Sequence, residues 1–178
     1  MAVQPVPAAV SENPGTTDNP ILDFFLTYWT AKRGTRAMPS RAEIAPADLK
    51  KYLGWLCFVD ALAEYRDFRF RLIGSRTAQY FLADATGLTV REAYAAAKAD
   101  SEATDSVLWI LRKTCRARVP MRVTGGGGEW RGHLYPDYDA LYLPLSEDGA
   151  AANMVMCAFT FNYQAYRETG TLSVMMKR

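Results

Sequence analysis

The sequence predicts an α+β domain built around a single antiparallel β-sheet. Two stretches with strand character come early in the chain, a helical block follows, and about three further strands come after that block. Runs of strands separated by one helical block are typical of α+β domains. The last strand, within "NMVMCAFTFNY", is apolar on both sides, so the sheet must be covered on both faces.

The chain of 178 residues has the length of one domain with its own core. Residues 1–19 are rich in proline and small polar residues and lack the basic start and apolar core of a signal peptide, so we expect a disordered leader there. The folded domain is expected over residues 20–165, with a C-terminal tail at 166–178. A tail of this length leads us to expect no attached output domain.

The net charge of +2 gives no electrostatic reason to expect binding to nucleic acid or to a membrane surface. No apolar run reaches the roughly 18 residues of a membrane helix. The three cysteines, Cys57, Cys115 and Cys157, lie far apart in apolar contexts and lack metal-ligand spacing. We therefore expect buried, reduced thiols in a cytoplasmic protein.

The first helix is expected over residues 20–33, because Asn19 is a good N-cap and Pro20 suits the first helical position. Its segment, "ILDFFLTYWTAKRG", ends with two basic residues and a glycine, as helix C-termini prefer. The aromatic face of this helix needs a cover. Either it packs on the sheet of its own domain or it forms a homodimer contact.

A polar loop then leads to a short helix that starts near Pro46. Arg41 in this loop could bind an anion or serve the fold. The next two segments, "WLCFVDAL" and "DFRFRLIGS", predict an antiparallel hairpin. Alternation in the second strand places Phe68, Phe70 and Leu72 on one face.

The middle of the chain, residues 75–100, predicts short helices broken by a turn at Gly87. A longer amphipathic helix follows over 106–118 and is closed by Pro120. These helices are expected to cover one face of the sheet, and the aromatic N-terminal helix the other. The apolar stripe of the longer helix consists of Val107, Ile110, Leu111, Thr114 and Cys115.

The last third predicts strands in "PMRVT", "YDALYLPLSEDG" and "NMVMCAFTFNY". Pro144 lies inside the second of them and suggests a bulge or an irregular stretch. Asp137 and Asp139, two residues apart, come before Pro144 in the sequence. They could do acid–base chemistry, but solvent-exposed carboxylates are the simpler interpretation.

Four of these segments, in this order, resemble the PAS domain, specifically its stand-alone bacterial form with an N-terminal helix. They are "YWTAKRGTRAMPSRAEIAPADLKKYL", "FRFRLIGS", "DATGL" and "DALYLPLSEDG", and the resemblance runs from about Leu22 to Tyr163. It implies a five-stranded antiparallel sheet flanked by helices, with the extra helix at the N-terminus. It also implies a sensory or regulatory module without a catalytic step of its own, which binds a small molecule or a signalling protein between the helices and the inner sheet face.

The residues that we place on that face and on the long helix are the candidate pocket: Phe68, Phe70, Leu72, Trp109, Tyr142 and Phe159. The resemblance names no cofactor. Members that bind haem commonly use a histidine of the long helix, and the light-sensing flavin proteins carry an "NCRFL"-type motif. Helix 106–118 has no histidine and "KTCRAR" does not match that motif, so the sequence speaks against haem and photochemical flavin.

Two other functions stay open. "VTGGGGEWRGH" joins four glycines to His133, the one histidine of the chain, which could serve a small α+β enzyme acting on an apolar substrate. The glycines match neither phosphate-loop pattern, so a flexible turn between strands is the simpler interpretation. Arg112 and Arg116, one helical turn apart, could instead grip the phosphates of a cyclic dinucleotide.

Overall fold

A six-stranded antiparallel sheet forms the centre of the molecule, with the strand order β1-β4-β7-β8-β2-β3. The computed structural model describes residues 7–80, 85–99, 101–125, 128–130, 133–135 and 137–162. The strands of the sheet are β1 Pro7–Glu12, β2 Leu56–Ala61, β3 Phe68–Ile73, β4 Met121–Gly125, β7 Asp137–Leu145 and β8 Met154–Asn162. A separate two-stranded ribbon consists of β5 Gly128–Trp130 and β6 His133–Tyr135.

The sheet has six strands rather than the expected five because β1 comes from the leader. Residues 7–12 pair with β4, and Val10 lies opposite Val123. The expectation of a disordered leader is therefore wrong for this segment. The prolines and small polar residues of this segment give no strand signal in the sequence. The segment nevertheless forms a strand, because the open edge of β4 supplies hydrogen-bond partners for its backbone.

Helix α1, Pro20–Arg33, has the predicted bounds. The Asn19 side chain accepts hydrogen bonds from the backbone N–H groups of Ile21 and Leu22, and Gly34, with φ +57°, ends the helix. The buried side chains of the helix are Leu22, Phe25, Leu26 and Trp29.

The other helices are short, apart from α5. They are η1 Arg41–Glu43, α2 Pro46–Leu49, η2 Lys50–Trp55, η3 Ala63–Tyr65, α3 Ser75–Tyr80, α4 Val90–Ala96 and α5 Ser101–Ala117. A turn at Gly87, with φ +89°, separates α3 from α4, as predicted. Helix α5 begins five residues before its predicted start, and it buries Leu108 together with four of the five residues predicted for its apolar stripe.

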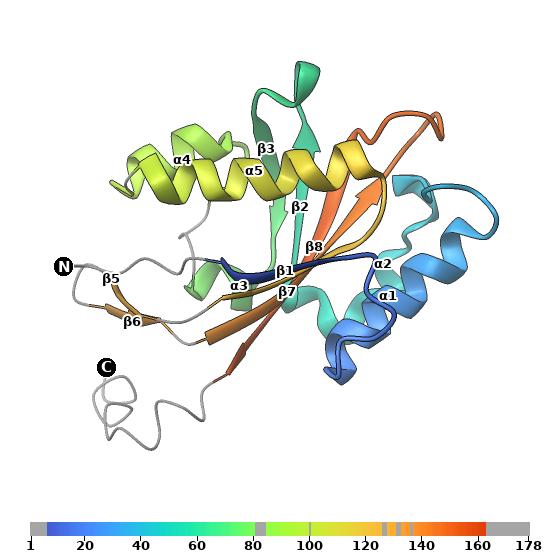
Figure 1. Ribbon diagram of the computed structural model, residues 1–178, viewed down its shortest axis with the longest axis horizontal. Helices are drawn as coiled ribbons and strands as arrows, with labels where there is room; N and C mark the ends of the chain where they lie inside the picture. The colour runs from blue at the N-terminus through green and yellow to red at the C-terminus, as the bar shows by residue number, and fades with distance from the viewer. Residues whose placement is uncertain are drawn as a thin grey trace.

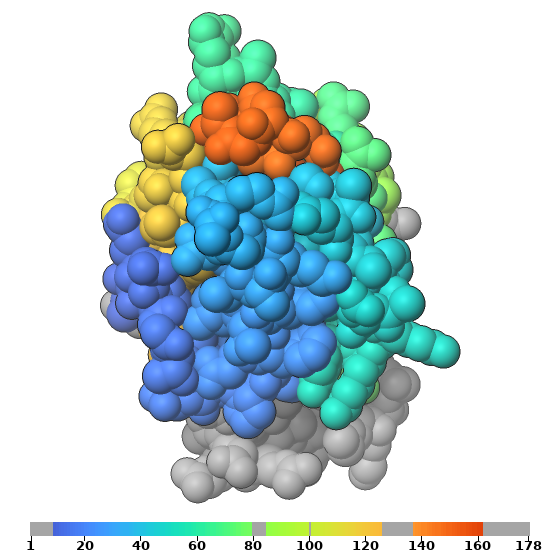
Figure 2. All heavy atoms as spheres, turned by 90° about the vertical axis from the view of Figure 1, so that its right-hand side faces the viewer, coloured from blue at the N-terminus to red at the C-terminus, as the bar shows by residue number. Residues whose placement is uncertain are grey.

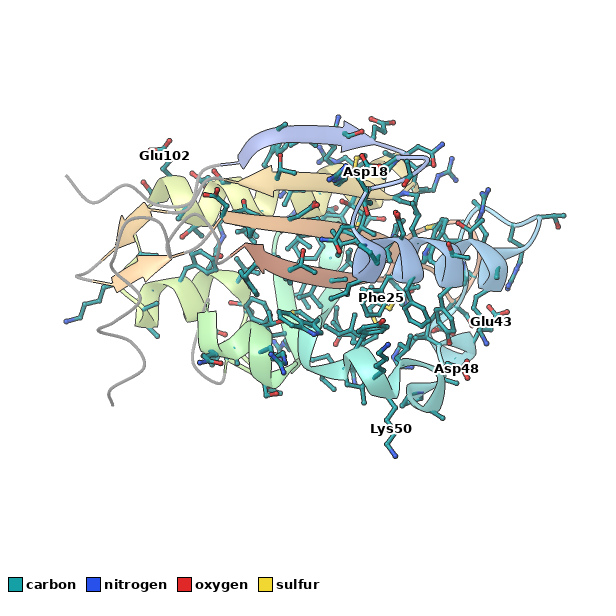
Figure 3. The ribbon with its side chains drawn as sticks, turned by 90° about the horizontal axis from the view of Figure 1, so that it is seen from below. Asp18, Phe25, Glu43, Asp48, Lys50 and Glu102 are labelled. Carbon is teal, nitrogen blue, oxygen red and sulfur yellow. The ribbon has the colours of Figure 1, made fainter. Side chains whose placement is uncertain are left out.

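Helices cover both faces of the sheet, as the sequence predicts. Helix α5 crosses one face, whereas α1 lies at the other side of the strands (Figures 1 and 3). On the α1 side, Asn19 Nδ2 donates to Thr160 Oγ1 at 2.7 Å, and Trp29 Nε1 donates to the carbonyl of Pro144 at 2.8 Å. Of the aromatic side chains of α1, Phe25 and Trp29 are thus buried by the chain itself, whereas Phe24 and Tyr28 are half-buried.

The α1 end of the molecule has a continuous surface formed by α1 and the segment that follows it, with the loop between β7 and β8 beside them (Figure 2). In Figure 3, Phe25 is enclosed among side chains, whereas Lys50 projects outward. Phe25 contacts Phe24 edge to face, and both rings contact Tyr52 from η2.

Pro144 causes no bulge, contrary to the expectation. It pairs in regular register with Val155 of β8. The neighbouring strand β4 begins at Met121, opposite Tyr142, and runs away from Pro144. Pro144 therefore has no β4 neighbour to which a backbone N–H would have to donate, and the missing donor costs nothing there.

Candidate functional site

Among the described residues, a cluster of six aromatic side chains lies on the sheet face that α4 and α5 cover, and we call this cluster the aromatic face. Strand pairing fixes four of them: Tyr138 lies opposite Phe161, and alternation along β7 and β8 brings Tyr142 and Phe159 to the same side. Trp55 and Tyr94 complete the group from η2 and α4. The members are Trp55, Tyr94, Tyr138, Tyr142, Phe159 and Phe161.

Two pairs of rings in the aromatic face are in contact. The Tyr142 and Phe159 rings meet edge to face, with centroids 5.9 Å apart, and the Trp55 and Phe161 centroids are 6.1 Å apart. Tyr142 is 6% exposed, whereas the other members are half-buried. The face is therefore most closed at Tyr142, and at Trp55 the Arg76 guanidinium stacks on the indole ring.

The tyrosine hydroxyls of this face remain protonated. Burial raises the pKa of Tyr138 to about 12. It also raises the pKa values of Tyr94 and Tyr142, and the neighbouring Tyr138 raises the pKa of both groups further. At neutral pH the three hydroxyls are therefore hydrogen-bond donors that can also accept.

Two cysteines lie beneath the closed end of the aromatic face. Cys157 pairs with Tyr142 on one side and with Cys57 on the other. Burial raises the pKa of the Cys57 thiol to about 12. All three cysteines are buried free thiols, as the sequence predicts.

Four of the six candidate pocket residues lie on the side of the sheet that α4 and α5 cover. Tyr142 and Phe159 belong to the aromatic face itself. Phe68 and Phe70, opposite Ala61 and Val59, lie farther along the same side. Both phenylalanines are buried, and Phe68 stacks on Tyr65 with centroids 6.4 Å apart.

Leu72 lies on the opposite side and is 41% exposed, so its assignment to the pocket is wrong. The cause is a bulge: Phe58 pairs with Leu72, but the next residue, Val59, pairs with Phe70. Arg71 is thus the extra residue of β3. One extra residue reverses the side on which every later side chain lies.

Trp109 is also wrong as a pocket residue, because it is 48% exposed on the outer side of α5. The side chains that α5 buries are its neighbours in sequence, Leu108 and Ile110. A shallow hollow beside the indole is lined by Ser101, Glu102, Asp105 and Ser106 of the same helix. Figure 3 shows Glu102 projecting outward from the helix at the edge of the molecule.

The arginine pair suggested for anion binding does not act as a pair in this structure. Arg112 Nε donates to the carbonyl of Tyr65 and Nη2 to that of Arg66, both at 2.9 Å. Arg116 is exposed. Arg112 therefore anchors the loop between β2 and β3, and Arg41 has a similar structural role, since it stacks on Phe58 and donates to the Ile44 carbonyl.

The two carboxylates at the start of β7 have different environments. Asp137 is exposed, as the simpler interpretation predicts. Asp139 is instead part-buried and accepts two hydrogen bonds from the Arg122 guanidinium, at 3.0 and 2.8 Å. Asp139 therefore serves as an ion-pair partner on the α1 side of the sheet.

The glycine run lies between β4 and the ribbon β5–β6. Gly125 ends β4 and Gly128 begins β5, while His133 pairs through its backbone with Trp130. Within the described residues, the segment between β4 and β7 thus contains the antiparallel pair β5–β6. The side chain of His133 and the tail 166–178 lie outside the described residues.

Comparison with known proteins decides the family. The model of the PAS domain family matches residues 18–159, which is most of the chain. The chain belongs to the PAS domain family. No curated protein and no solved structure gave a significant match to this PAS domain.

Four members of the aromatic face of this PAS domain are absent from the pocket residues that the sequence predicts. Tyr138 and Phe161 could have been found by continuing the alternation from Tyr142 and from Phe159. Trp55 and Tyr94 gave no such signal, because they come from helical segments whose position over the sheet depends on the fold.

The described part of the PAS domain contains no group of three or more His, Cys, Asp or Glu side chains placed to hold a metal ion. Within the same residues, no helix is both long and apolar enough to cross a membrane.

Proposed function

We propose that this protein is a stand-alone sensory or regulatory PAS module that binds a small molecule on the aromatic face. Membership of the family supports a role in signalling. The observation that carries the choice of site is the convergence of six aromatic side chains, three of them with protonated hydroxyls, on the sheet face beneath α4 and α5.

The chemistry of the aromatic face favours an uncharged, planar ligand with hydrogen-bond acceptors. Aromatic rings offer flat apolar contact, and the members of this face are uncharged at neutral pH. Protonated hydroxyls can donate to carbonyl or ether oxygens of the ligand. Ligand sites of this kind combine apolar walls with a few well-placed polar groups.

The module is proposed to have no catalytic step of its own and to pass its signal to a partner protein in the cytoplasm. The buried free thiols support a reducing compartment. The homodimer considered for helix 20–33 stays a prediction and is not part of this proposal. Phe25 and Trp29 of α1 are buried by the chain itself, whereas Phe24 and Tyr28 are only half-buried.

A thermal-shift screen of the full chain tests the proposal. The probes are flavone, benzamide and indole-3-carboxaldehyde, which are uncharged aromatic carbonyl compounds, and benzoate serves as the charged comparison. We expect at least one uncharged compound to raise the melting temperature of the wild type and to have a smaller effect on Tyr142→Phe. Tyr52→Phe, on the α1 side, is the matched control and should respond like the wild type. If benzoate alone shifts the melting temperature, or if the two variants respond alike, the proposed site is wrong.

A further inference from the structure

The three cysteines of the chain, far apart in sequence, come near one another at the closed end of the aromatic face, two on the strands and one on the covering helix α5. Cys57 on β2 lies directly opposite Cys157 on β8, and Cys115 of α5 is close enough for its charge to affect Cys157. We propose that Cys57 and Cys157 are a redox-sensitive pair that hydrogen peroxide converts to a reversible disulfide. That disulfide would alter the closed end of the aromatic face.

The register of the strands brings the two thiols within reach of each other. Directly opposed residues of antiparallel strands have Cα atoms about 4.5–5.5 Å apart, and disulfides join Cα atoms about 4.4–6.8 Å apart. Both side chains lie on the same face of the sheet, because they form a direct cross-strand pair. The strands therefore need no change of register to form the bond.

The bond would be strained, which makes it reducible. Opposed Cβ atoms lie about 4.5–5.5 Å apart, whereas a relaxed disulfide holds them about 3.5–4.5 Å apart. Closing the bond must draw β2 and β8 together at this point. Strained disulfides have more oxidising potentials and are the labile, regulatory ones.

Hydrogen peroxide is the two-electron oxidant in this reaction. One thiol loses its proton, and the thiolate attacks the peroxide, breaks the O–O bond and becomes a sulfenic acid; the departing hydroxide takes up that proton as water. The second thiol then attacks the sulfenic sulfur and releases a second water as the S–S bond forms. Overall, two thiols lose two hydrogens and two electrons to one peroxide molecule, which is reduced to two waters.

The closed structure protects the pair. Cys57 is 3% exposed and Cys157 2% exposed, and burial keeps both thiols protonated by raising their pKa values. The thiolate is the reactive form, so oxidation requires α4 and α5 to open away from the sheet. The rate of disulfide formation then depends on how often α4 and α5 open away from the sheet.

The consequence for the site follows from the neighbouring strand. Cys157 is also the cross-strand partner of Tyr142 on β7. Drawing Cys157 toward β2 shifts the residue opposite Tyr142, which is the most buried member of the aromatic face. This effect on ligand binding rests on the proposed function, whereas the formation of the disulfide does not.

Peroxide treatment of the full chain, followed by mass spectrometry under non-reducing conditions, tests the pair. We expect a loss of about 2 Da and a cross-linked peptide that joins Cys57 to Cys157, both reversed by a thiol reductant. Cys115→Ala should still form the link and Cys57→Ala should not. Peptide mapping of the wild type answers the question even if a variant fails to fold. A link to Cys115, a link between two chains, or no change of mass would overturn the proposal.

A second arm separates this pair from the proposed function. The oxidation is repeated with flavone at about ten times its dissociation constant, where bound ligand should slow opening, and hence disulfide formation, about tenfold. An unchanged rate would overturn the coupling to the aromatic face while the disulfide itself stands.

Discussion

Gly125, the last residue of β4, lies directly opposite Tyr138 of the aromatic face. The ring of Tyr138 covers the glycine so closely that a Cβ atom there would overlap the ring carbons. We therefore expect Gly125→Ala to displace the ring and to move the Tyr138 hydroxyl out of the site.

The expected loss of folding free energy in Gly125→Ala follows from this overlap with the Tyr138 ring. Adding one methyl group to a well-packed position typically costs about 1–3 kcal/mol, because neighbouring side chains leave their preferred rotamers. For a chain of this size, that range lowers the melting temperature by about 2–12 °C. Gly15→Ala is the matched control, because nothing lies within 4 Å of its added Cβ. Its change should stay within about 0.5 kcal/mol.

Urea denaturation of both single variants gives these free energies directly. In a Tyr138→Ala background the ring is absent, so Gly125→Ala should lose most of its cost there. If Gly125→Ala is as mild as Gly15→Ala, or if its cost is unchanged without the Tyr138 ring, the packing described for this end of the site is wrong.

Two further predictions concern the α1 side of the molecule. Trp29→Phe leaves the buried carbonyl of Pro144 without its 2.8 Å hydrogen bond. The loss of this bond alone should lower the free energy of unfolding, measured by urea denaturation, by about 1–3 kcal/mol. The exposed Trp109→Phe should cost far less, and equal costs would refute the role of the Trp29 indole. The Arg36 guanidinium and the Ser40 backbone N–H lower the pKa of Glu43 from 4.5 to about 2. Because the folded-state pKa is depressed, the stabilisation is full above about pH 4.5 and is lost as the pH falls toward 2. The urea midpoint of the wild type should therefore fall more steeply than that of Glu43→Gln across this window, and parallel pH profiles would contradict the ion pair.

The sequence predicted elements whose signals are local. Asn19, Pro20 and Gly34 mark the ends of α1 because capping depends on residues next to the helix termini. The hairpin of β2 and β3 was predicted from its alternation, and the cover of both sheet faces from the apolar β8.

What the sequence could not predict depends on partners distant in the chain. β1 has little apolar character, and it is a strand because β4 offers an open edge. The bulge at Arg71 has no residue signature, yet it decides on which side of the sheet Leu72 lies. Arg112 resembles a solvated or anion-binding residue until the fold brings the carbonyls of Tyr65 and Arg66 to it.

The most direct test of the central claim is calorimetric titration with the best-bound uncharged compound of the panel. Tyr142→Phe removes one donor from the closed end of the aromatic face, so its dissociation constant should rise about tenfold over that of the wild type. Tyr52→Phe should match the wild type. Equal affinities for all three proteins would contradict the claim that the aromatic face is the binding site.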